Sequence, residues 1–254
     1  MTTRDFDLII YGASSFVGQI MTRYLAEHIG FSGTVKWAIA GRSPSKLNEL
    51  RASLGEVAAN LPIIIADADD VNALAKLCQS TRVIATTVGP YALYGEQMVK
   101  ACAENGTDYC DLCGEAYWIK RMIVKYADAA EQTGARIVSC CGFDSIPSDL
   151  GVHFLQQQGH QRFGKYFTAI KLAVNKMKGG ASGGTLASMI EAVKAAKSDP
   201  KLRKEMNNPY ILCPEKIDLR HPQVSIKGPK FDNDFQRWSA PFIMAAINTK
   251  NIHR

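Results

Sequence analysis

The first 140 residues alternate between short apolar runs and segments whose apolar residues recur at helical spacing. The first run, Phe6–Tyr11, predicts a strand. The segment after it predicts a helix whose buried face combines two rows of apolar residues four apart, namely Phe16, Ile20 and Tyr24, and Val17, Met21 and Leu25. In all, we predict six strands separated by helices, at residues 6–11, 34–40, 61–66, 82–88, 108–112 and 136–140. Because parallel strands need right-handed helical crossovers, this order predicts a Rossmann-like, doubly wound parallel α/β sheet.

The pattern changes after Pro147. Residues 166–177 alternate apolar and polar positions, which predicts an antiparallel strand with one solvent-exposed face. A glycine-rich segment, KGGASGGT, then leads into a predicted helix at 185–197. Five of the ten prolines lie between residues 200 and 229, so we predict irregular rather than helical structure there. We therefore expect a domain at 1–146 and a smaller, incomplete, mixed α and β domain at 147–254.

Composition excludes several classes of protein. The net charge of +6 lies entirely in residues 194–254, where basic residues are spread thinly, so we expect a solvated surface and no nucleic-acid partner. The seven cysteines include one CDLC pair in a strand-like run, where alternate side chains diverge, so we expect neither a disulfide framework nor a metal site. The longest uncharged run is too short to span a membrane and the start lacks a signal-peptide pattern, which predicts a cytoplasmic protein.

The segment YGASSFVG, residues 11–18, lies between the first predicted strand and helix. Free amides and the helix dipole at such a turn bind phosphate. Gly12 permits a tight turn, Gly18 permits close packing of the helix on the sheet, and Ser15 occupies the middle position of the spacing GxxGxxG. We predict that a dinucleotide contacts the turn residues Gly12, Ala13, Ser14, Ser15, Phe16 and Gly18.

The residues after the second and third strands select the nucleotide. The second strand ends in AGRSPSKL, with no acidic residue to accept from ribose hydroxyls. Arg42, with Ser43 and Lys46, would bind a 2′-phosphate, which favours NADP over NAD. Asp67, after the third strand, either accepts from the adenine amino group or caps the next helix.

The fourth strand ends in TTVGPYALYGE, at the edge where doubly wound sheets bind ligands. Val88, Gly89 and Pro90 would either lie beside the nicotinamide or form an ordinary turn. The chain has no Tyr and Lys four residues apart, which disfavours a short-chain dehydrogenase. Hydrolase and kinase motifs are likewise missing from the sequence.

Six blocks in order carry a resemblance to a known family: GASSFVG, AGRSPSKL, TVGPYALYGEQMVKAC, DYCDLCGE, GFDSIPSDLG and SGGTLASMIEA. From about Asp5 to His253 the chain resembles the saccharopine dehydrogenase-like oxidoreductases, in the branch that includes mycobacterial trans-acting enoyl reductases. The resemblance implies an NADP-binding Rossmann domain and a second domain that contributes to the substrate cleft and to homodimer contacts. Family members usually have glycine in place of Ser15 and continue well past Arg254, so the chain resembles a version without the C-terminal part.

Two carboxylic acids follow the fifth and sixth strands. Glu115 and Asp144 would either deliver a proton while NADPH delivers hydride, or begin the next helices. The resemblance favours reduction of a polarised double bond, such as an enoyl or enone group on a lipid-like small molecule. The alternatives are a saccharopine-type oxidoreductase acting on an amino acid or imine, and a non-catalytic NADP-binding sensor or scaffold at a membrane surface.

Overall fold

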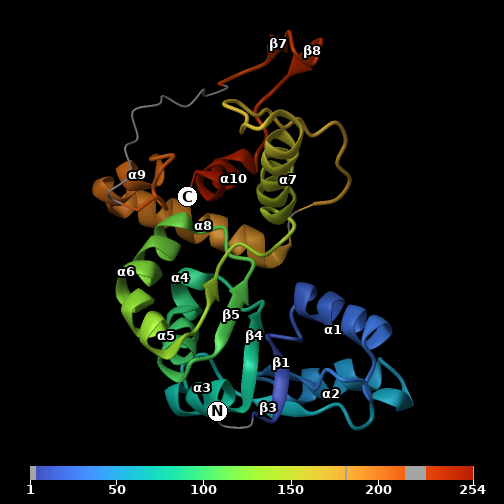
Figure 1. The fold of residues 1–254 in the computed structure, drawn as a ribbon. Coiled ribbons are helices and arrows are strands. Elements are labelled where there is room, and N and C mark those ends of the chain that lie inside the picture. Colours follow the sequence, from blue (N-terminus) through green and yellow to red (C-terminus); the bar gives the residue numbers. More distant parts are fainter. Residues whose placement is uncertain (1–3, 181, 215–226, 254) are drawn as a thin grey trace.

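The computed structural model describes residues 4–180, 182–214 and 227–253. Its centre is a six-stranded sheet in the order β3-β2-β1-β4-β5-β6, with every neighbouring pair parallel. The strands are β1 Phe6–Tyr11, β2 Trp37–Gly41, β3 Ile63–Ile65, β4 Thr81–Thr86, β5 Asp108–Asp111 and β6 Ile137–Val138. This order confirms the predicted Rossmann-like, doubly wound sheet, and it places the switch in strand order between β1 and β4 (Figure 1).

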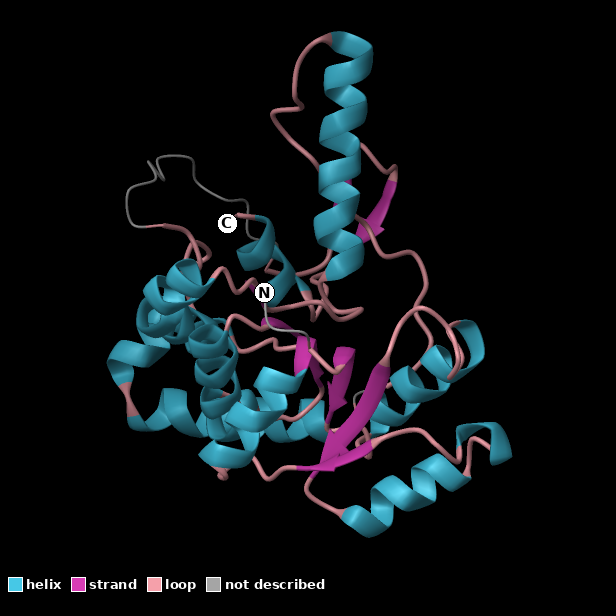
Figure 2. Ribbon diagram, turned by 60° about the horizontal axis from the view of Figure 1, so that its bottom comes forward, coloured by secondary structure: helices cyan, strands magenta, loops and turns pink. Residues whose placement is uncertain are grey.

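Helices cover both faces of this sheet (Figures 1 and 2). On one face lie α1 (Phe16–His28) and α2 (Pro44–Ala52). On the other lie α3 (Val71–Ser80), the short α4 (Tyr91–Tyr94), α5 (Glu96–Asn105) and α6 (Ala116–Thr133). Neighbouring residues of β1 face opposite ways, since Ile10 packs with Leu47 of α2 whereas Ile9 packs with Leu74 of α3. We call residues 4–145 the sheet region.

The prediction that both apolar rows of α1 are buried is wrong. Phe16, Ile20 and Tyr24 are 69%, 51% and 58% exposed. Met21 and Leu25 of the other row pack against the α1–α2 side of the core. Rows that start one residue apart point about 100° apart around a helix, and a helix lying on a sheet buries only one such stripe.

The C-terminal region, residues 146–253, contains four helices and one hairpin among its described residues. They are α7 (Ile146–Phe163), α8 (Gly183–Ser198), α9 (Pro200–Met206), β7 (Lys230–Asp232), β8 (Arg237–Ser239) and α10 (Ala245–Ile252). The helix predicted at 185–197 is α8, and the predicted domain boundary falls at the start of α7. α7 projects away from the sheet (Figure 2).

The prediction of irregular structure between residues 200 and 229 is wrong for α9. Pro200 occupies the first turn of α9, where a missing N–H costs nothing. Asp199 caps this helix, since its Oδ1 accepts from the amides of Lys201 (2.8 Å) and Leu202 (3.1 Å). Pro222, which also supported the prediction, lies outside the described residues.

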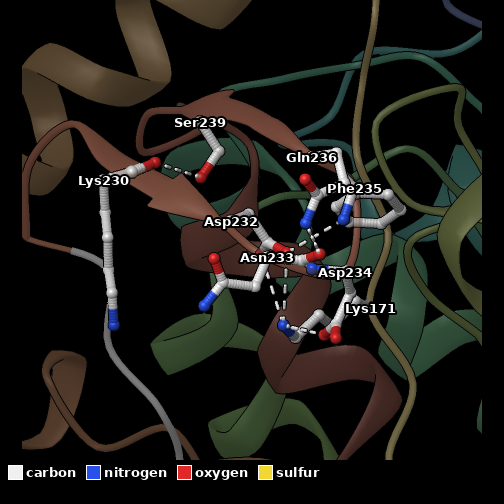
Figure 3. Close-up of polar contacts among 8 residues, drawn as sticks. All are labelled: Lys171, Lys230, Asp232, Asn233, Asp234, Phe235, Gln236 and Ser239. Carbon is white, nitrogen blue, oxygen red and sulfur yellow. Dashed lines mark hydrogen bonds and ion pairs between the residues drawn. The ribbon is translucent and has the colours of Figure 1, made fainter.

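The predicted strand at 166–177 is also not formed. This segment lies beside the β7–β8 hairpin through side chains, as Figure 3 shows for Lys171. The Lys171 ammonium binds the carboxylates of Asp232 (3.3 Å) and Asp234. Arg237 donates to the Asn175 amide oxygen at 2.8 Å. An isolated extended segment needs a backbone ladder to become a strand, and ion pairs between side chains do not supply one.

The C-terminal region contacts the sheet region mainly through α9 and the turn after it. Leu202, Ile211 and Leu212 are buried in the core that contains α3, α5 and α6. α10 is joined to α7 by Asn248, whose amide nitrogen donates to the Ser148 hydroxyl at 3.1 Å. Across the described ranges, no helix is both long enough and apolar enough to cross a membrane.

Candidate functional site

The turn between β1 and α1 leaves no room for side chains at two positions. Gly12 has a φ of +84°, and a Cβ there would lie 2.6 Å from Val88 Cγ2. A Cβ on Gly18 would overlap the Gly12 carbonyl oxygen and lie 2.8 Å from Ala13 Cα. Gly18 therefore allows α1 to lie close against the turn that follows β1, and its role in packing the helix on the sheet stays a prediction. The chain folds tightly where β1 ends.

Three amides at this turn are free to bind an anion. Within the part of the chain that the structure describes, the N–H groups of Ser14, Phe16 and Val17 have no hydrogen-bond partner. The neighbouring amides are occupied, since Ser15 N donates to Gly12 O at 2.9 Å and Gly18 N donates to Ser15 Oγ at 3.0 Å. Free amides at a helix start, together with the helix dipole, form a phosphate site.

Ser15 holds the turn against the end of β4. Its hydroxyl caps α1 and lies 2.8 Å from Thr87 Oγ1. Thr87 Oγ1 in turn donates to the Gly12 carbonyl at 2.9 Å. The hydroxyl of Ser15 is therefore used inside the protein, between the two strands where the sheet order switches.

The ends of β2 and β3 place Arg42 and Asp67 close enough to Tyr11, at the end of β1, for both charges to act on its pKa. Burial raises the pKa of Tyr11; the Asp67 carboxylate raises it further and the Arg42 guanidinium opposes the rise. The Arg42 side chain is exposed and forms no ion pair with any described residue, so its charge is available to a ligand.

Ser43 and Lys46 follow Arg42 at the start of α2. Ser43 caps this helix by accepting from the Lys46 amide at 3.5 Å, and the Lys46 side chain is exposed. The interpretation of Asp67 as the cap of the next helix is wrong, because Asp70 Oδ1 accepts from the Ala73 amide at the start of α3. Asp67 instead accepts from the Asp69 amide at 3.2 Å.

The loop after β4 is held in place by hydrogen bonds to Glu115. Glu115 Oε1 accepts from the Tyr91 amide at 2.9 Å, and Oε2 accepts from the Ala92 amide at 2.8 Å. Ser188 of α8 donates its hydroxyl to Oε1 at 2.9 Å. Glu115 occupies the N-cap position of α6 but its side chain makes no cap there, so the predicted capping role is wrong for α6. The carboxylate caps α4 instead, and fixes the segment that follows Val88, Gly89 and Pro90.

A family comparison agrees with this geometry. Residues 8–138, about half of the chain, match the family described as the saccharopine dehydrogenase NADP binding domain. The chain belongs to this family. Its saccharopine dehydrogenase NADP-binding domain therefore contains the β1–α1 turn, Arg42 and Glu115, and the predicted resemblance and NADP cofactor are confirmed.

Named relatives match the chain over almost its whole length. It is 40% identical to a Mycobacterium tuberculosis protein whose name places it among the trans-acting enoyl reductases. It is 36% identical, over 99% of its length, to the trans-acting enoyl reductase of Mycobacterium ulcerans. In both cases the chain spans 61% of the relative's own length. Among solved structures, apo saccharopine dehydrogenase (L-Glu forming) from Saccharomyces cerevisiae has 18% identity and a TM-score of 0.44, covering 61% of this chain and 32% of that one.

The two predicted proton donors, Asp144 and Glu115, are not in contact with each other. Asp144 is half-buried in the turn before α7, where no hydrogen bond of its side chain to another described residue is seen. Glu115, in contrast, is only 5% exposed and its carboxylate receives three hydrogen bonds. Both oxygens of the Glu115 carboxylate are therefore occupied by hydrogen bonds within the protein.

A third carboxylate, which sequence reasoning missed, lies at the end of β5 of the NADP-binding domain. Asp111 Oδ1 accepts from the amides of Cys113 and Cys140, each at 2.9 Å. Its Oδ2 accepts from the hydroxyls of Tyr109 (2.8 Å) and Ser139 (3.2 Å). Burial raises the pKa of Asp111. An acidic residue that ends a buried strand, in YCDL, was the signal available in the sequence.

Two hollows lie at opposite edges of the domain. A cavity of about 310 Å³ follows β6 and is lined by residues that include Cys140, Cys141, Asp149 and Asn251. A larger hollow of about 690 Å³ lies at the amino ends of the strands, where Arg82 pairs with Asp7 and Arg136 with Asp108. Ligands of doubly wound sheets bind at the carboxyl ends, so the smaller cavity is the one on the candidate site's side. No cluster of three or more His, Cys, Asp or Glu able to hold a metal ion occurs among the described residues.

Proposed function

We propose that this chain, or the protein of which it is part, uses NADPH to reduce a polarised carbon–carbon double bond in an enoyl or enone group. The observation that carries the proposal is the set of three unpartnered amides at the β1–α1 turn, with the unpaired Arg42 one strand away. The names of the relatives, which are trans-acting enoyl reductases, support the reaction class, and a lipid-like substrate is our own proposal.

We propose one contact for each part of the cofactor. The turn from Gly12 to Gly18 binds the pyrophosphate through amides, and Arg42, with Ser43 and Lys46, binds the 2′-phosphate. Asp67 accepts from the adenine, and Val88, Gly89 and Pro90 lie beside the nicotinamide. When bound, NADPH supplies the hydride.

Replacing Arg42 by Ala tests the cofactor assignment. We expect Arg42→Ala to weaken NADPH binding by about 1–3 kcal/mol, the range for a lost charge-assisted hydrogen bond, and to leave NADH binding unchanged. Arg23→Ala removes another exposed arginine, on α1, and is the matched control. Fluorescence titration of both nucleotides gives the two affinities. Equal weakening of NADPH and NADH by Arg42→Ala would refute the assignment.

The proton is assigned to Asp144. Its side chain is half-buried after β6. Unlike the carboxylate of Glu115, it accepts no hydrogen bond from another described residue. We expect Asp144→Asn to slow NADPH oxidation by about 10²-fold or more with an enone substrate, and to leave the affinity for NADPH unchanged. The control is Asp128→Asn on the exposed side of α6. Full turnover by Asp144→Asn would remove Asp144 from the mechanism.

A saccharopine-type reaction on an imine is the second candidate, and the family match favours it. That chemistry needs cationic side chains to bind substrate carboxylates, and the blocks 142–151 and 182–192 contain no Arg or Lys. A panel of enones and imines, followed by NADPH oxidation, separates the two. Tight NADPH binding without turnover of either class would favour the sensor. Homodimer formation and a peripheral membrane location stay predictions.

A further inference from the structure

We propose that Glu115 is a positioning residue, which sets the loop at Val88–Tyr91 for the nicotinamide half of the cofactor and couples that loop to α8. The inference rests on the proposed function, because it assigns Val88, Gly89 and Pro90 to the nicotinamide. It replaces the proton-donor role that the sequence suggested for Glu115.

Glu115 is itself held rigidly. It begins the 18-residue helix α6, and its carbonyl accepts from the amides of Trp118 (2.9 Å) and Ile119 (3.0 Å). Its side chain is almost wholly buried. Because this carboxylate is fixed to a long helix, it restricts the position of the groups that are hydrogen-bonded to it.

The Glu115 carboxylate binds backbone amides of the loop. The amides of Tyr91 and Ala92 lie in the first turn of α4, where helical geometry provides no acceptor for them. Each carboxylate oxygen accepts one of them. Without Glu115 the buried Tyr91 amide and the half-buried Ala92 amide would both be unsatisfied, so the loop would have to move to find other partners.

Other contacts hold the far side of the loop. The Tyr91 hydroxyl donates to Thr86 O at 3.2 Å, and the Tyr91 and Trp118 rings lie 5.7 Å apart. A Cβ on Gly95 would lie 2.6 Å from the Trp118 ring. These contacts fix the side chain of Tyr91 and the end of α4, whereas the backbone that leads from Gly89 into α4 is positioned by Glu115.

The third hydrogen bond reaches into the C-terminal region. Ser188 lies on α8, 73 residues after Glu115, and its hydroxyl donates to the same oxygen that accepts from Tyr91. Three segments of the chain therefore meet at one carboxylate: the loop after β4, the start of α6, and α8. A shift of α8 changes the hydrogen bonding of the loop, and by linkage a ligand that orders the loop favours this position of α8.

Glu115→Gln tests the positioning role. Glutamine has a similar shape, but its NH₂ group must face one of the two loop amides, both of which are donors. We expect the Kd for NADPH to rise about tenfold or more, the cost of one unsatisfied buried donor. The Kd for adenosine 2′,5′-bisphosphate, which lacks the nicotinamide, should change less than about twofold, because Arg42 and the β1–α1 turn are untouched.

Two comparisons make the result specific. Glu131→Gln, on the exposed side of α6, is the matched control and should change neither Kd. Arg42→Ala should weaken both ligands, since both carry the 2′-phosphate. Ser188→Ala, a change that favours helix, should raise the Kd for NADPH about threefold and leave the Kd for the bisphosphate unchanged.

Each outcome decides the proposal. Equal weakening of both ligands by Glu115→Gln, or no weakening of NADPH, overturns the positioning role. If Glu115→Gln does not fold, Ser188→Ala decides, and an unchanged Kd for NADPH in that variant overturns the coupling to α8. If the wild-type chain binds neither ligand, the proposed cofactor site fails first, and that result is distinguishable because it needs no variant.

Discussion

The sheet region and the C-terminal region differ in how they bury apolar side chains. In the sheet region, residues such as Ile9, Ile39 and Leu74 are fully buried between a sheet and its helices. In the C-terminal region, α8 has no buried residue, and α7 buries only Ser148 and Gly159. Large apolar residues of α7 and α8 are exposed instead: Leu150, Phe154, Phe163, Leu186, Met189 and Val193.

The two regions therefore contribute differently: the sheet region provides most of the buried core, whereas α8 contacts the candidate site. The sheet region has its own core, and the C-terminal region adds Leu202, Ile211 and Leu212 to it. α8 is joined to that region by the hydrogen bond between Ser188 and Glu115 and by the partly buried Ala192 and Ala195, which pack against the same core. The comparison therefore predicts that stability depends mainly on the sheet region, and that α8 influences the site through the hydrogen bond from Ser188 to Glu115.

The largest effect should come from a matched pair of leucines. Leu74 on α3 is 0% exposed, whereas Leu186 on α8 is 52% exposed. We expect Leu74→Ala to lower the free energy of unfolding by about 2–5 kcal/mol, because a buried leucine leaves a cavity. Leu186→Ala should change it by less than about 1 kcal/mol. Urea unfolding measures both, and equal losses would break the comparison.

A matched pair of glycines should give the next largest effect. Gly12 and Gly164 both have positive φ, but only Gly12 would place a Cβ against other atoms. We expect Gly12→Ala to lower the free energy of unfolding by about 1–3 kcal/mol and to abolish NADPH binding. Gly164→Ala, at the end of α7, should cost about 1 kcal/mol and leave NADPH binding intact. Unfolding curves and a nucleotide titration test the pair, which fails if Gly12→Ala still binds NADPH normally.

Asp111 lies where the two regions join. It accepts hydrogen bonds from Ser139 and Cys140, in the connection from β6 to α7, and so provides a third test of the comparison. Burial raises its folded pKa above the unfolded value, so its contribution to stability is complete below about pH 4 and is lost as pH rises through the raised value. We expect the smallest effect here. The free energy of unfolding of the wild type, minus that of Asp111→Asn, should fall as pH rises from about 4.

Urea unfolding at a series of pH values measures this slope. Asparagine keeps an acceptor for the amides of Cys113 and Cys140 and offers its NH₂ to the two hydroxyls, so the fold should survive. Asp128→Asn, an exposed change on α6, is the control for loss of a surface carboxylate. A difference that grows with pH would show that the folded pKa is lowered, contrary to our account.

Periodicity predicted the sheet region well because each strand and helix there has a buried face. It failed where burial depends on a distant partner. Both rows of α1 consist of large hydrophobic residues, and only the position of the helix on the sheet decides that Met21 rather than Ile20 packs against the core. Residues 166–177 alternate like a strand, yet no strand among the described residues pairs with them.

The candidate site shows the same limit. The β1–α1 turn and Arg42 were predictable because both follow from the ends of neighbouring strands in one topology. The use of Ser15 was not, since its partner Thr87 lies 72 residues away. The contacts of Glu115 with Tyr91 and Ser188 span 24 and 73 residues, and no local pattern reports them.

The central claim is that the β1–α1 turn and Arg42 together bind NADPH. A crystal structure of the chain grown with NADPH tests it most directly. Our account predicts the pyrophosphate against the amides of Ser14, Phe16 and Val17, with the 2′-phosphate against the Arg42 guanidinium. A structure in which the nucleotide binds elsewhere, or in which the Ser15 side chain occupies the place of the pyrophosphate, would contradict the account.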